Sequence, residues 1–310
     1  MKNQSYVTYN REDTARLLSF SALVDAIAHA AEEYATGGIL SPERLVVPLS
    51  ESAVMLSMPA VSHDVAIHKL VNVVPDNKSR HIPTIHGLVT VFDAQTGAPL
   101  FVLDGPEVTG RRTAAVSMLG IRTFMQAAPE EILLIGTGTQ AVYHLQAIAD
   151  LYPNCKVWVR GSRPGRAEAF CEQHASLHPS LAPCEFDALP ESANVVITLT
   201  TSTSAFYHAD ARPDVLVIGV GAFKPNMAEI GSRTLAGSDI YVDDPEGAKQ
   251  EAGDLLQAGV DWASVRSLIS ALRDEPATRR ATRRPIVYKT VGTGAWDLAA
   301  GRVARAALGI

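Results

Sequence analysis

The chain is poor in the features that mark membrane-spanning and secreted proteins. It has no uninterrupted run of about 20 apolar residues, which a membrane-spanning helix needs, and residues 1–13 contain no apolar signal core. Its only cysteines, Cys155, Cys171 and Cys184, are odd in number and lack metal-ligand or CxxC spacing. We therefore expect a protein of the reducing cytosol, with no membrane partner and no metal.

Positive charge is also scarce. The chain has 27 Lys and Arg against 33 Asp and Glu, a net charge of -6, which argues against a nucleic acid as partner. Of its 310 residues 47% are hydrophobic and 19% are charged, which is typical of a folded globular protein with one large domain or two.

The first third of the sequence predicts a mostly β unit with a helix in front. Residues 19–38 carry apolar side chains at helical spacing, begin with a serine and end in two glycines. The strand candidates that follow are 44–49, 53–58, 66–74, 85–93 and 99–104, with 94–97 as a hairpin turn.

After Arg112 the patterns of helix and strand alternate. The expected helices are 113–128, 139–151 and 164–175, and the expected strands are 131–136, 156–161, 194–200, 214–221 and 239–244. Strands separated by helix-length segments imply a parallel, doubly wound sheet. The sequence thus predicts an α/β chain with a Rossmann domain over 118–292. A second, mostly β domain takes 1–117 and the Ala-rich helix in 293–310.

A glycine loop follows the first strand of the Rossmann part. The segment ILLIGTGTQAVYHL places Gly136, Gly138 and Ala141 in the pattern GxGxxA, between an apolar strand and a helix. The first glycine permits a tight turn, the second lets backbone approach a pyrophosphate, and the small third residue lets helix and strand pack closely. This context favours a dinucleotide cofactor, with Thr139 and Gln140 in the first helical turn.

The end of the second strand distinguishes between the two nicotinamide cofactors. An NAD-preferring fold places Asp or Glu there to bind the ribose 2′-OH, but this chain has Arg160, Ser162 and Arg163 and no acid before Glu168. Arginines and a hydroxyl suit a 2′-phosphate, so we expect NADPH, with NADH possible and less favoured. Arginines that merely decorate a helix start would not explain the missing acid.

Two adjacent arginines, Arg111 and Arg112, precede the expected helix at 113. A helix start attracts anions through its N–H groups and dipole, and arginine adds a forked donor for a carboxylate or a phosphate. Both side chains could instead be solvated, and from these residues alone the choice stays open.

Four segments of the chain share the order and spacing of a known family. They are KLVNVVPDN (69–77), DAQTGAPLFVLDG (93–105), VTGRRTAAVS (108–117) and IGTGTQA (135–141). Together they resemble the ornithine cyclodeaminase/mu-crystallin family, from about Arg44 to the segment 292–299. Within that family, PTIHGLVTVFDA (83–94) is most similar to the ketimine reductases, in particular the Δ1-pyrroline-2-carboxylate reductases.

The resemblance implies a homodimer in which the β unit binds substrate and forms the dimer, with an active site in the cleft beside the Rossmann domain. It implies that Arg44, Lys69 and Arg112 bind a substrate carboxylate, with Thr84 beside them, and that Arg111 faces elsewhere. The cofactor positions that the motifs and the resemblance together imply are Thr84, Thr113, Gly136, Gly138, Thr139, Gln140, Ala141, Arg160, Ser162, Arg163, Thr200 and Val220.

The implied activity is NADPH-dependent reduction of a cyclic imine that carries a carboxylate. Δ1-Pyrroline-2-carboxylate would yield L-proline, and Δ1-piperideine-2-carboxylate would yield L-pipecolate. The ring size stays open because one methylene changes binding by only ~1–3 kcal/mol. The proton could come from solution, from Lys69, or from His86, which shares a strand face with Thr84. Asp297 matches an acid of the family that we interpret as orienting or structural.

Three alternatives come from the same family: an ornithine cyclodeaminase, an open-chain amino-acid dehydrogenase, and a mu-crystallin-like protein that only binds NADPH or a small ligand. The first two need an acid beside the substrate nitrogen. Phe223 stands at the position where the cyclodeaminases and alanine dehydrogenases carry an aspartate. Leu56 likewise replaces an acid that members acting on ornithine use for the distal amine. These replacements favour the reductase.

Overall fold

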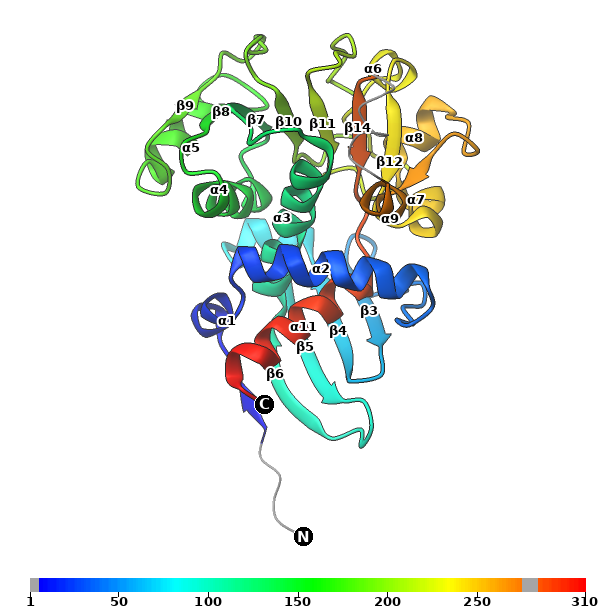
Figure 1. The fold of residues 1–310 in the computed structure, drawn as a ribbon. Helices are drawn as coiled ribbons and strands as arrows, with labels where there is room; N and C mark the ends of the chain where they lie inside the picture. The colour runs from blue at the N-terminus through cyan, green and yellow to red at the C-terminus, as the bar shows by residue number, and fades with distance from the viewer. Residues whose placement is uncertain (1–5, 275–283) are drawn as a thin grey trace. The chain divides into compact units, whose positions relative to one another are not determined.

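The computed structural model describes residues 6–274 and 284–310. Residues 1–5, part of the N-terminal stretch expected to lack a signal core, and 275–283 lie outside the described residues. In the described parts no helix has the length and apolar character to cross a membrane. The chain divides into two compact units, Met1–Thr113 with Thr293–Ile310, and Ala114–Gly292. The sequence suggests the first boundary at 117, and Figure 1 shows the course of the chain through both units.

A six-stranded sheet forms the centre of the first unit. Its strands, in spatial order, are β1 (Val7–Thr8), β6 (Pro99–Asp104), β5 (Ile85–Asp93), β4 (Val65–Val73), β3 (Val54–Val61) and β2 (Leu45–Pro48). Neighbouring strands from β6 to β2 are antiparallel, and β1 pairs in parallel with β6. Five of the six strands match those expected from the sequence; the two-residue β1 is too short to show a pattern.

Helices cover one face of this sheet. The unit has α1 (Arg11–Leu17), α2 (Phe20–Ala35) and α11 (Gly294–Leu308), and a 3-10 helix, η1 (Pro75–Arg80). Helix α11 packs on β3, β4 and β5 and against α2 (Figure 1). Alternate residues of β4, from Val65 to Val71, point to these helices and are buried, and Trp296 of α11 is also fully buried. This alternation also turns Lys69 into the core.

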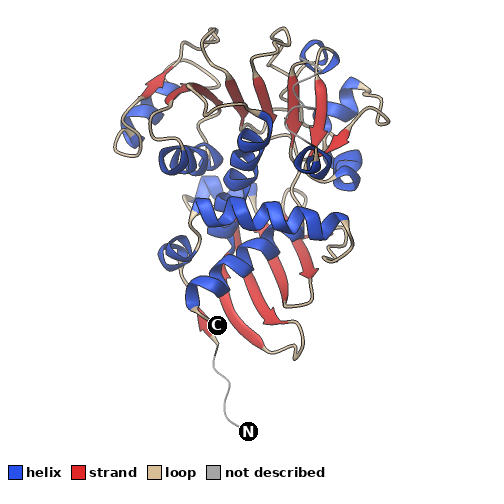
Figure 2. Ribbon diagram, viewed as in Figure 1, coloured by secondary structure: helices blue, strands red, loops and turns tan. Residues whose placement is uncertain are grey.

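The second unit is a parallel sheet, and helices form part of the connections between its strands (Figure 2). The strands, in spatial order, are β13 (Arg266–Ser267), β12 (Asp239–Val242), β14 (Ile286–Lys289), β11 (Leu216–Gly219), β10 (Val195–Thr198), β7 (Glu131–Ile135), β8 (Lys156–Arg160) and β9 (Leu181–Pro183). All pairings are parallel. The expected α/β class and doubly wound sheet are confirmed.

The helices of this unit precede the sheet or lie in the connections between its strands. They are the second half of α3 (Gly105–Phe124), α4 (Thr139–Leu151), α5 (Arg166–His174), α6 (Ser232–Ala236), α7 (Pro245–Glu251), α8 (Gly253–Ala258) and α9 (Leu268–Arg273). The chain runs outward from β7 to β8 and β9, and then returns to β10 on the other side of β7. Ligands of such sheets bind where the strand order reverses, at the carboxyl ends of the strands. Here that point lies between β7 and β10.

Helix α3 begins earlier than the sequence suggested. We expected a helix over 113–128 that starts just after Arg112, but α3 runs from Gly105 to Phe124. The Asp104 carboxylate accepts a hydrogen bond of 2.8 Å from the Glu107 N–H, and Pro106 suits a first helical turn, where its missing N–H is not needed. The arginine pair therefore lies within the helix, so the attraction of a helix start for anions does not apply to it.

Candidate active site

The first unit buries two cations around one carboxylate. Lys69 of β4 donates from Nζ to Asp297 Oδ2 of α11 at 2.5 Å, and Arg112 Nε of α3 lies 3.2 Å from Asp297 Oδ1. The side chains of Lys69 and Asp297 are 3% and 0% exposed. Within the described residues, neither Arg112 Nε nor Asp297 Oδ1 has a hydrogen-bond partner, so the second contact is an ion pair only.

Burial and neighbouring charges set the state of Lys69. Burial lowers the pKa of Lys69 to about 8; Asp297 opposes this shift, and the positive charges of Arg112 and Arg44 add to it. Arg44 is half-buried and directly precedes β2. The structure therefore brings Lys69 and Arg112 to Asp297, and Arg44 acts on Lys69 through its charge. A small anion is the natural counter-charge for such a cluster.

The two adjacent arginines of α3 point to different surroundings. Arg111 donates to Glu107 Oε1 at 3.0 Å and to the Leu18 carbonyl oxygen at 3.1 Å, and its guanidinium lies 4.4 Å from the Phe20 ring centroid. Arg112 instead faces Asp297. As expected from the sequence, Arg111 faces away from the cluster and helps to pack the N-terminal helices.

His86 is not brought to this cluster. In the sheet, Lys69 lies opposite Val89, on the face that the helices cover, whereas His86 lies opposite Asn72. Because side chains alternate along a strand, His86 points from the opposite face, and its side chain is exposed. Thr84 is half-buried and directly precedes β5, and its carbonyl oxygen accepts from the Val74 N–H at 2.8 Å.

The glycine loop of the second unit has the geometry that its sequence predicts. Gly136, after β7, has a φ of 130°, and a Cβ there would lie 2.7 Å from the Leu199 carbonyl oxygen. Gly138 is the N-cap of α4 without a side-chain hydrogen bond, and a Cβ there would meet nothing within 4 Å. Ala141 is fully buried. The main chain is thus open at Gly138, as a pyrophosphate requires.

Side chains beside this loop are also placed for a ligand. Thr139 and Gln140 form the first turn of α4, and the buried Gln140 Oε1 has no hydrogen-bond partner within the described part of the chain. An unpaired buried acceptor at a helix start fits a ligand that carries hydroxyl donors, such as a ribose. These residues fit a dinucleotide.

The end of β8 carries positive charge without an acid. Arg160 is half-buried, and its guanidinium lies 5.6 Å from the centroid of the Phe206 ring. Burial lowers the pKa of Arg160. Ser162 and Arg163 lie in the exposed turn between β8 and α5. Since β8 is the neighbour of β7, these side chains are one strand away from the glycine loop.

The carboxyl ends of β10 and β11 carry two further predicted cofactor positions. Thr200, which follows β10, donates its N–H and hydroxyl to Glu229 Oε1 at 2.6 and 2.9 Å. Val220, which follows β11, donates its N–H to the Thr198 carbonyl oxygen at 3.1 Å. Thr113 is half-buried and is the last residue that the first unit contributes to α3.

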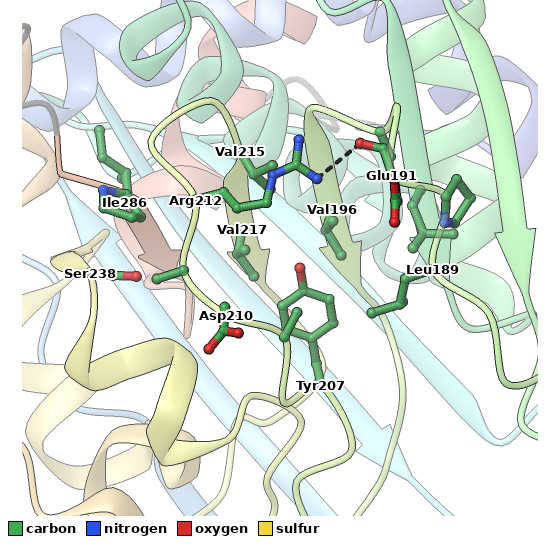
Figure 3. Close-up of a pocket in the computed structure, with 16 residues that line it drawn as sticks. Leu189, Glu191, Val196, Tyr207, Asp210, Arg212, Val215, Val217, Ser238 and Ile286 are labelled. Atoms are coloured by element: carbon green, nitrogen blue, oxygen red, sulfur yellow. Dashed lines mark hydrogen bonds between the residues drawn. The ribbon is translucent and has the colours of Figure 1, made fainter.

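The second unit also contains a cavity of about 260 Å³ (Figure 3). Its walls include Val196, Val215 and Ile286, and the hydroxyl of Tyr207 points into it. Arg212 at its rim donates to the Glu191 carbonyl oxygen at 2.9 Å. None of the residues that the sequence singled out lines this cavity.

The sequence of the chain matches a known family over almost its whole length. The sequence model of the ornithine cyclodeaminase/mu-crystallin family matches residues 5–308. The chain belongs to this family. Over 300 residues it is 53% identical to the Δ1-pyrroline-2-carboxylate reductase 2 of Burkholderia ambifaria, covering 97% of this chain and 95% of that relative. It is 50% identical, at the same coverage, to the Δ1-pyrroline-2-carboxylate/Δ1-piperideine-2-carboxylate reductase of Azospirillum brasilense.

Solved structures of other proteins share this fold. The Δ1-pyrroline-2-carboxylate reductase of Thermococcus litoralis, determined in complex with NADH and L-proline, aligns with a TM-score of 0.83 over 97% of both chains at 22% identity. An archaeal alanine dehydrogenase with bound NAD also aligns with a TM-score of 0.83, at 23% identity. One architecture thus serves more than one reaction, and the residues of the site must distinguish them.

Two buried acids have a larger part in this structure than the sequence indicated. Asp297 had been interpreted as orienting or structural, and it is the acid that joins Lys69 and Arg112. Glu229 was not predicted as a site residue, and it is fully buried at the carboxyl ends of two strands. In the sequence, the available signal for each of these two acids was a charged residue within a segment of small residues. Among the described residues no group of three or more His, Cys, Asp and Glu side chains is placed to hold a metal.

Proposed function

We propose that this chain is a reductase of cyclic imine carboxylates that uses a nicotinamide cofactor and acts on Δ1-pyrroline-2-carboxylate, Δ1-piperideine-2-carboxylate or both. The observation that carries the proposal is the buried cluster of Lys69, Arg112 and Asp297. Its excess of positive charge suits a small substrate with one carboxylate. Relatives that are 50–53% identical over nearly the whole chain are named as reductases of these imines.

The proposed role of the cluster is to bind and orient the substrate carboxylate. The planar fork of Arg112 suits both oxygens of a carboxylate, and Arg44 and Lys69 add charge. Asp297 balances that charge and fixes the Lys69 ammonium by a 2.5 Å hydrogen bond. Thr84 shares the strand face of His86, opposite to that of Lys69, so it is not proposed as a contact of this carboxylate. Orientation matters here because an imine carbon accepts a hydride only along a narrow approach.

The cofactor, when bound, supplies the hydride. We propose that the open backbone at Gly138, followed by Thr139 and Gln140, holds its pyrophosphate, with Gly136 and Ala141 shaping the turn. Thr113, Thr200 and Val220 are the positions proposed on its nicotinamide side.

Lys69 is the proposed proton donor. Hydride adds to the imine carbon, and the ring nitrogen takes up one proton, which gives a neutral secondary amine. With a pKa of about 8, Lys69 is mostly protonated at pH 7 and loses its proton above pH 8. The kcat/KM for reduction is therefore expected to fall above about pH 8, and this limb of the profile should vanish in Lys69→Arg.

We further propose that NADPH is preferred over NADH. The support is the exposed Ser162 and Arg163 and the half-buried Arg160 after β8, where an NAD-binding chain carries an acid. NADPH should give the higher kcat/KM, and Arg163→Ala should narrow the ratio by removing a charge-assisted contact. Equal or better use of NADH by the parent protein would exclude the preference.

A homodimer is proposed from the uncovered face of the first sheet. Leu45, Leu70 and Leu88 lie in one row across this face and are 61%, 36% and 50% exposed. The row runs Leu45, Ser57, Leu70, Leu88, so three of these four residues are exposed leucines, and such an apolar surface suits a second copy of itself. Leu70→Glu with Leu88→Lys should give a monomer in sedimentation analysis.

The cysteines Cys155, Cys171 and Cys184 are free and buried, which supports a cytoplasmic location.

Steady-state kinetics with both cyclic imines and with NADPH and NADH test the proposed function. We expect reduction of at least one imine and no ammonia from L-ornithine. Phe223 cannot accept a proton, and Leu56 cannot hold a second ammonium, so deamination lacks its acids. Ammonia and proline formed from ornithine with catalytic NAD would overturn the assignment, and binding of NADPH without turnover would reveal a storage protein.

A further inference from the structure

A single buried carboxylate joins the ends of two strands in the second unit. Glu229 lies between β11 and α6 and is fully buried. It accepts five hydrogen bonds of 2.6 to 3.2 Å, from Thr198 Oγ1, Thr200 N, Thr200 Oγ1, Gly221 N and Ala222 N. Three of these partners are backbone N–H groups, which can only donate, and an ionised carboxylate, which only accepts, suits all five.

Four of the five donors come from two loops, and the fifth, the Thr198 hydroxyl, comes from the last residue of β10. Oε1 of Glu229 takes the N–H and hydroxyl of Thr200, in the loop after β10. Oε2 takes the N–H groups of Gly221 and Ala222, in the loop after β11, and the hydroxyl of Thr198. The two oxygens thus hold the two loops at a fixed separation.

A second acid and a buried lysine anchor Glu229 itself. Asp254 Oδ1 accepts from the backbone N–H of Glu229 and of Ile230, at 2.5 and 2.8 Å. Lys289 of β14 is fully buried; its Nζ lies 3.1 Å from Asp254 Oδ2 and 3.2 Å from the Gly219 carbonyl oxygen. Burial raises the pKa of Glu229, and Lys289 and the bonds from Thr200 oppose that rise.

The strand order indicates which half of a cofactor these loops would meet. The sheet order β8, β7, β10, β11 places β10 and β11 on the side of the glycine loop away from β8. In a doubly wound fold the pyrophosphate lies at the glycine loop after β7, and the adenosine ribose lies at the end of β8. The nicotinamide half then extends over the ends of β10 and β11.

We infer that Glu229 is a positioning residue that holds the surface beneath the nicotinamide. The inference rests on the proposed use of a nicotinamide cofactor. Glu229 does not contact the reacting atoms; it fixes the backbone of Thr200, Gly221 and Ala222, against which the nicotinamide ring and its ribose lie. Its loss should therefore impair hydride transfer far more than it impairs binding of the adenosine half.

Glu229→Gln tests this role. The substituted amide keeps the size but turns an N–H₂ toward N–H donors, so one of the two loops is released. We expect kcat/KM for imine reduction to fall at least tenfold, with a lower kcat, while the Kd of ADP, which carries only the adenosine and pyrophosphate half, changes less than twofold. Hydrogen exchange at Thr200, Gly221 or Ala222 should accelerate.

Thr234→Val is the matched control. It removes a buried hydrogen bond of 2.6 Å to the Ala209 carbonyl oxygen in the same unit, away from the carboxyl ends of β10 and β11. It should lower Tm and leave kcat/KM within twofold of the parent. If Glu229→Gln fails to fold, Thr198→Val removes one of the five bonds and should lower kcat two- to fivefold with unchanged ADP affinity.

The outcomes separate this inference from the proposed function. A parent protein that reduces no imine and binds no NADPH or NADH contradicts the proposed function. An active parent whose Glu229→Gln variant keeps kcat within twofold, or loses ADP affinity and kcat in equal measure, overturns the positioning role.

Discussion

The two units carry anion sites of opposite construction. In the first unit, buried charged side chains, Lys69 and Arg112, surround Asp297. In the second, the glycine loop offers main-chain N–H groups at the start of α4, and Gly138 leaves the approach open. The first site needs an internal counter-ion because buried charge is costly without a partner. The second needs none, since backbone dipoles carry no net charge.

The two sites also differ in how far apart their residues lie in the sequence. Lys69 and Asp297 are 228 positions apart in the sequence, so their contact depends on α11 packing correctly on the sheet. The glycine loop is built within a few residues of β7 and α4. We therefore expect side-chain substitutions to damage the first site through its charge balance, and Cβ additions to damage the second through its backbone.

The largest expected effect comes from breaking the charge balance of the first site. Asp297→Asn leaves Lys69 and Arg112 buried side by side without their acid and should cost about 3–5 kcal/mol of unfolding free energy, measured by urea denaturation. The matched control is Asp64→Asn. Asp64 pairs with Arg302 in the same unit but is 33% exposed, so its loss should cost no more than about 1 kcal/mol. Equal losses in both variants would show that burial of the pair is irrelevant.

The second unit should respond to acid through a buried neutral group. His144 is fully buried, with Nε2 2.9 Å from Ser117 Oγ and Nδ1 2.7 Å from the Gln140 carbonyl oxygen. Burial lowers the pKa of His144 to about 4. Its folded pKa is below its unfolded value, so between pH 6.5 and 4 the unfolded state binds more protons, and stability falls as pH falls. The loss over this window should reach about 3 kcal/mol.

Urea denaturation at pH 7 and pH 4 measures that loss. The His144→Gln variant should be less stable at pH 7 but should show a smaller change between the two pH values. The same pH dependence in parent and variant would assign the effect to other groups.

Two glycine substitutions separate the role of the glycine loop in folding from its role in binding the cofactor. Gly136→Ala places a Cβ 2.7 Å from the Leu199 carbonyl oxygen at a φ of 130°, and should cost about 1–3 kcal/mol of stability. Gly138→Ala meets no atom within 4 Å at a φ of -92°, so Tm should be nearly unchanged. Its methyl group occupies the approach to the main chain, and the Kd of NADPH should rise at least tenfold.

The smallest expected effect distinguishes the two adjacent arginines. Arg112→Lys keeps the charge but loses the fork, and should lower kcat/KM at least tenfold, about 1.4 kcal/mol, with NADPH binding intact. Arg111→Lys should leave kcat/KM within twofold, because Arg111 binds Glu107 and Phe20. The reverse result would show that the wrong arginine has been assigned to the substrate.

The sequence predicted the second unit well where the pattern is local. The strand before Gly136, the helix after it and the parallel arrangement all follow from apolar runs separated by helix-length segments. Strand β14 was missed because it is four residues long and ends in Lys289, which reads as a surface residue. Asp254 comes close to Lys289 only in the folded chain, where it neutralises the buried lysine.

The candidate site shows the same limit. Alternation along β5 places His86 and Thr84 on one face, but the sequence does not tell which face the helices cover. The pairing of β5 with β4 shows that Lys69 points to the face covered by the helices and that His86 points to the opposite face. Asp297 could be recognised only through resemblance to a family, since nothing near it in the sequence points to Lys69.

Helix α11 also sets the order in which the parts of the chain become complete during synthesis. The strands β2 to β6 leave the ribosome before residues 114–292, whereas α11 and Asp297 follow them. Until then Lys69 lacks the acid with which it pairs in the folded unit. The strands of the second unit are contiguous and all available earlier. A chain released before Gly294 would therefore carry a dinucleotide fold with no finished place for the substrate.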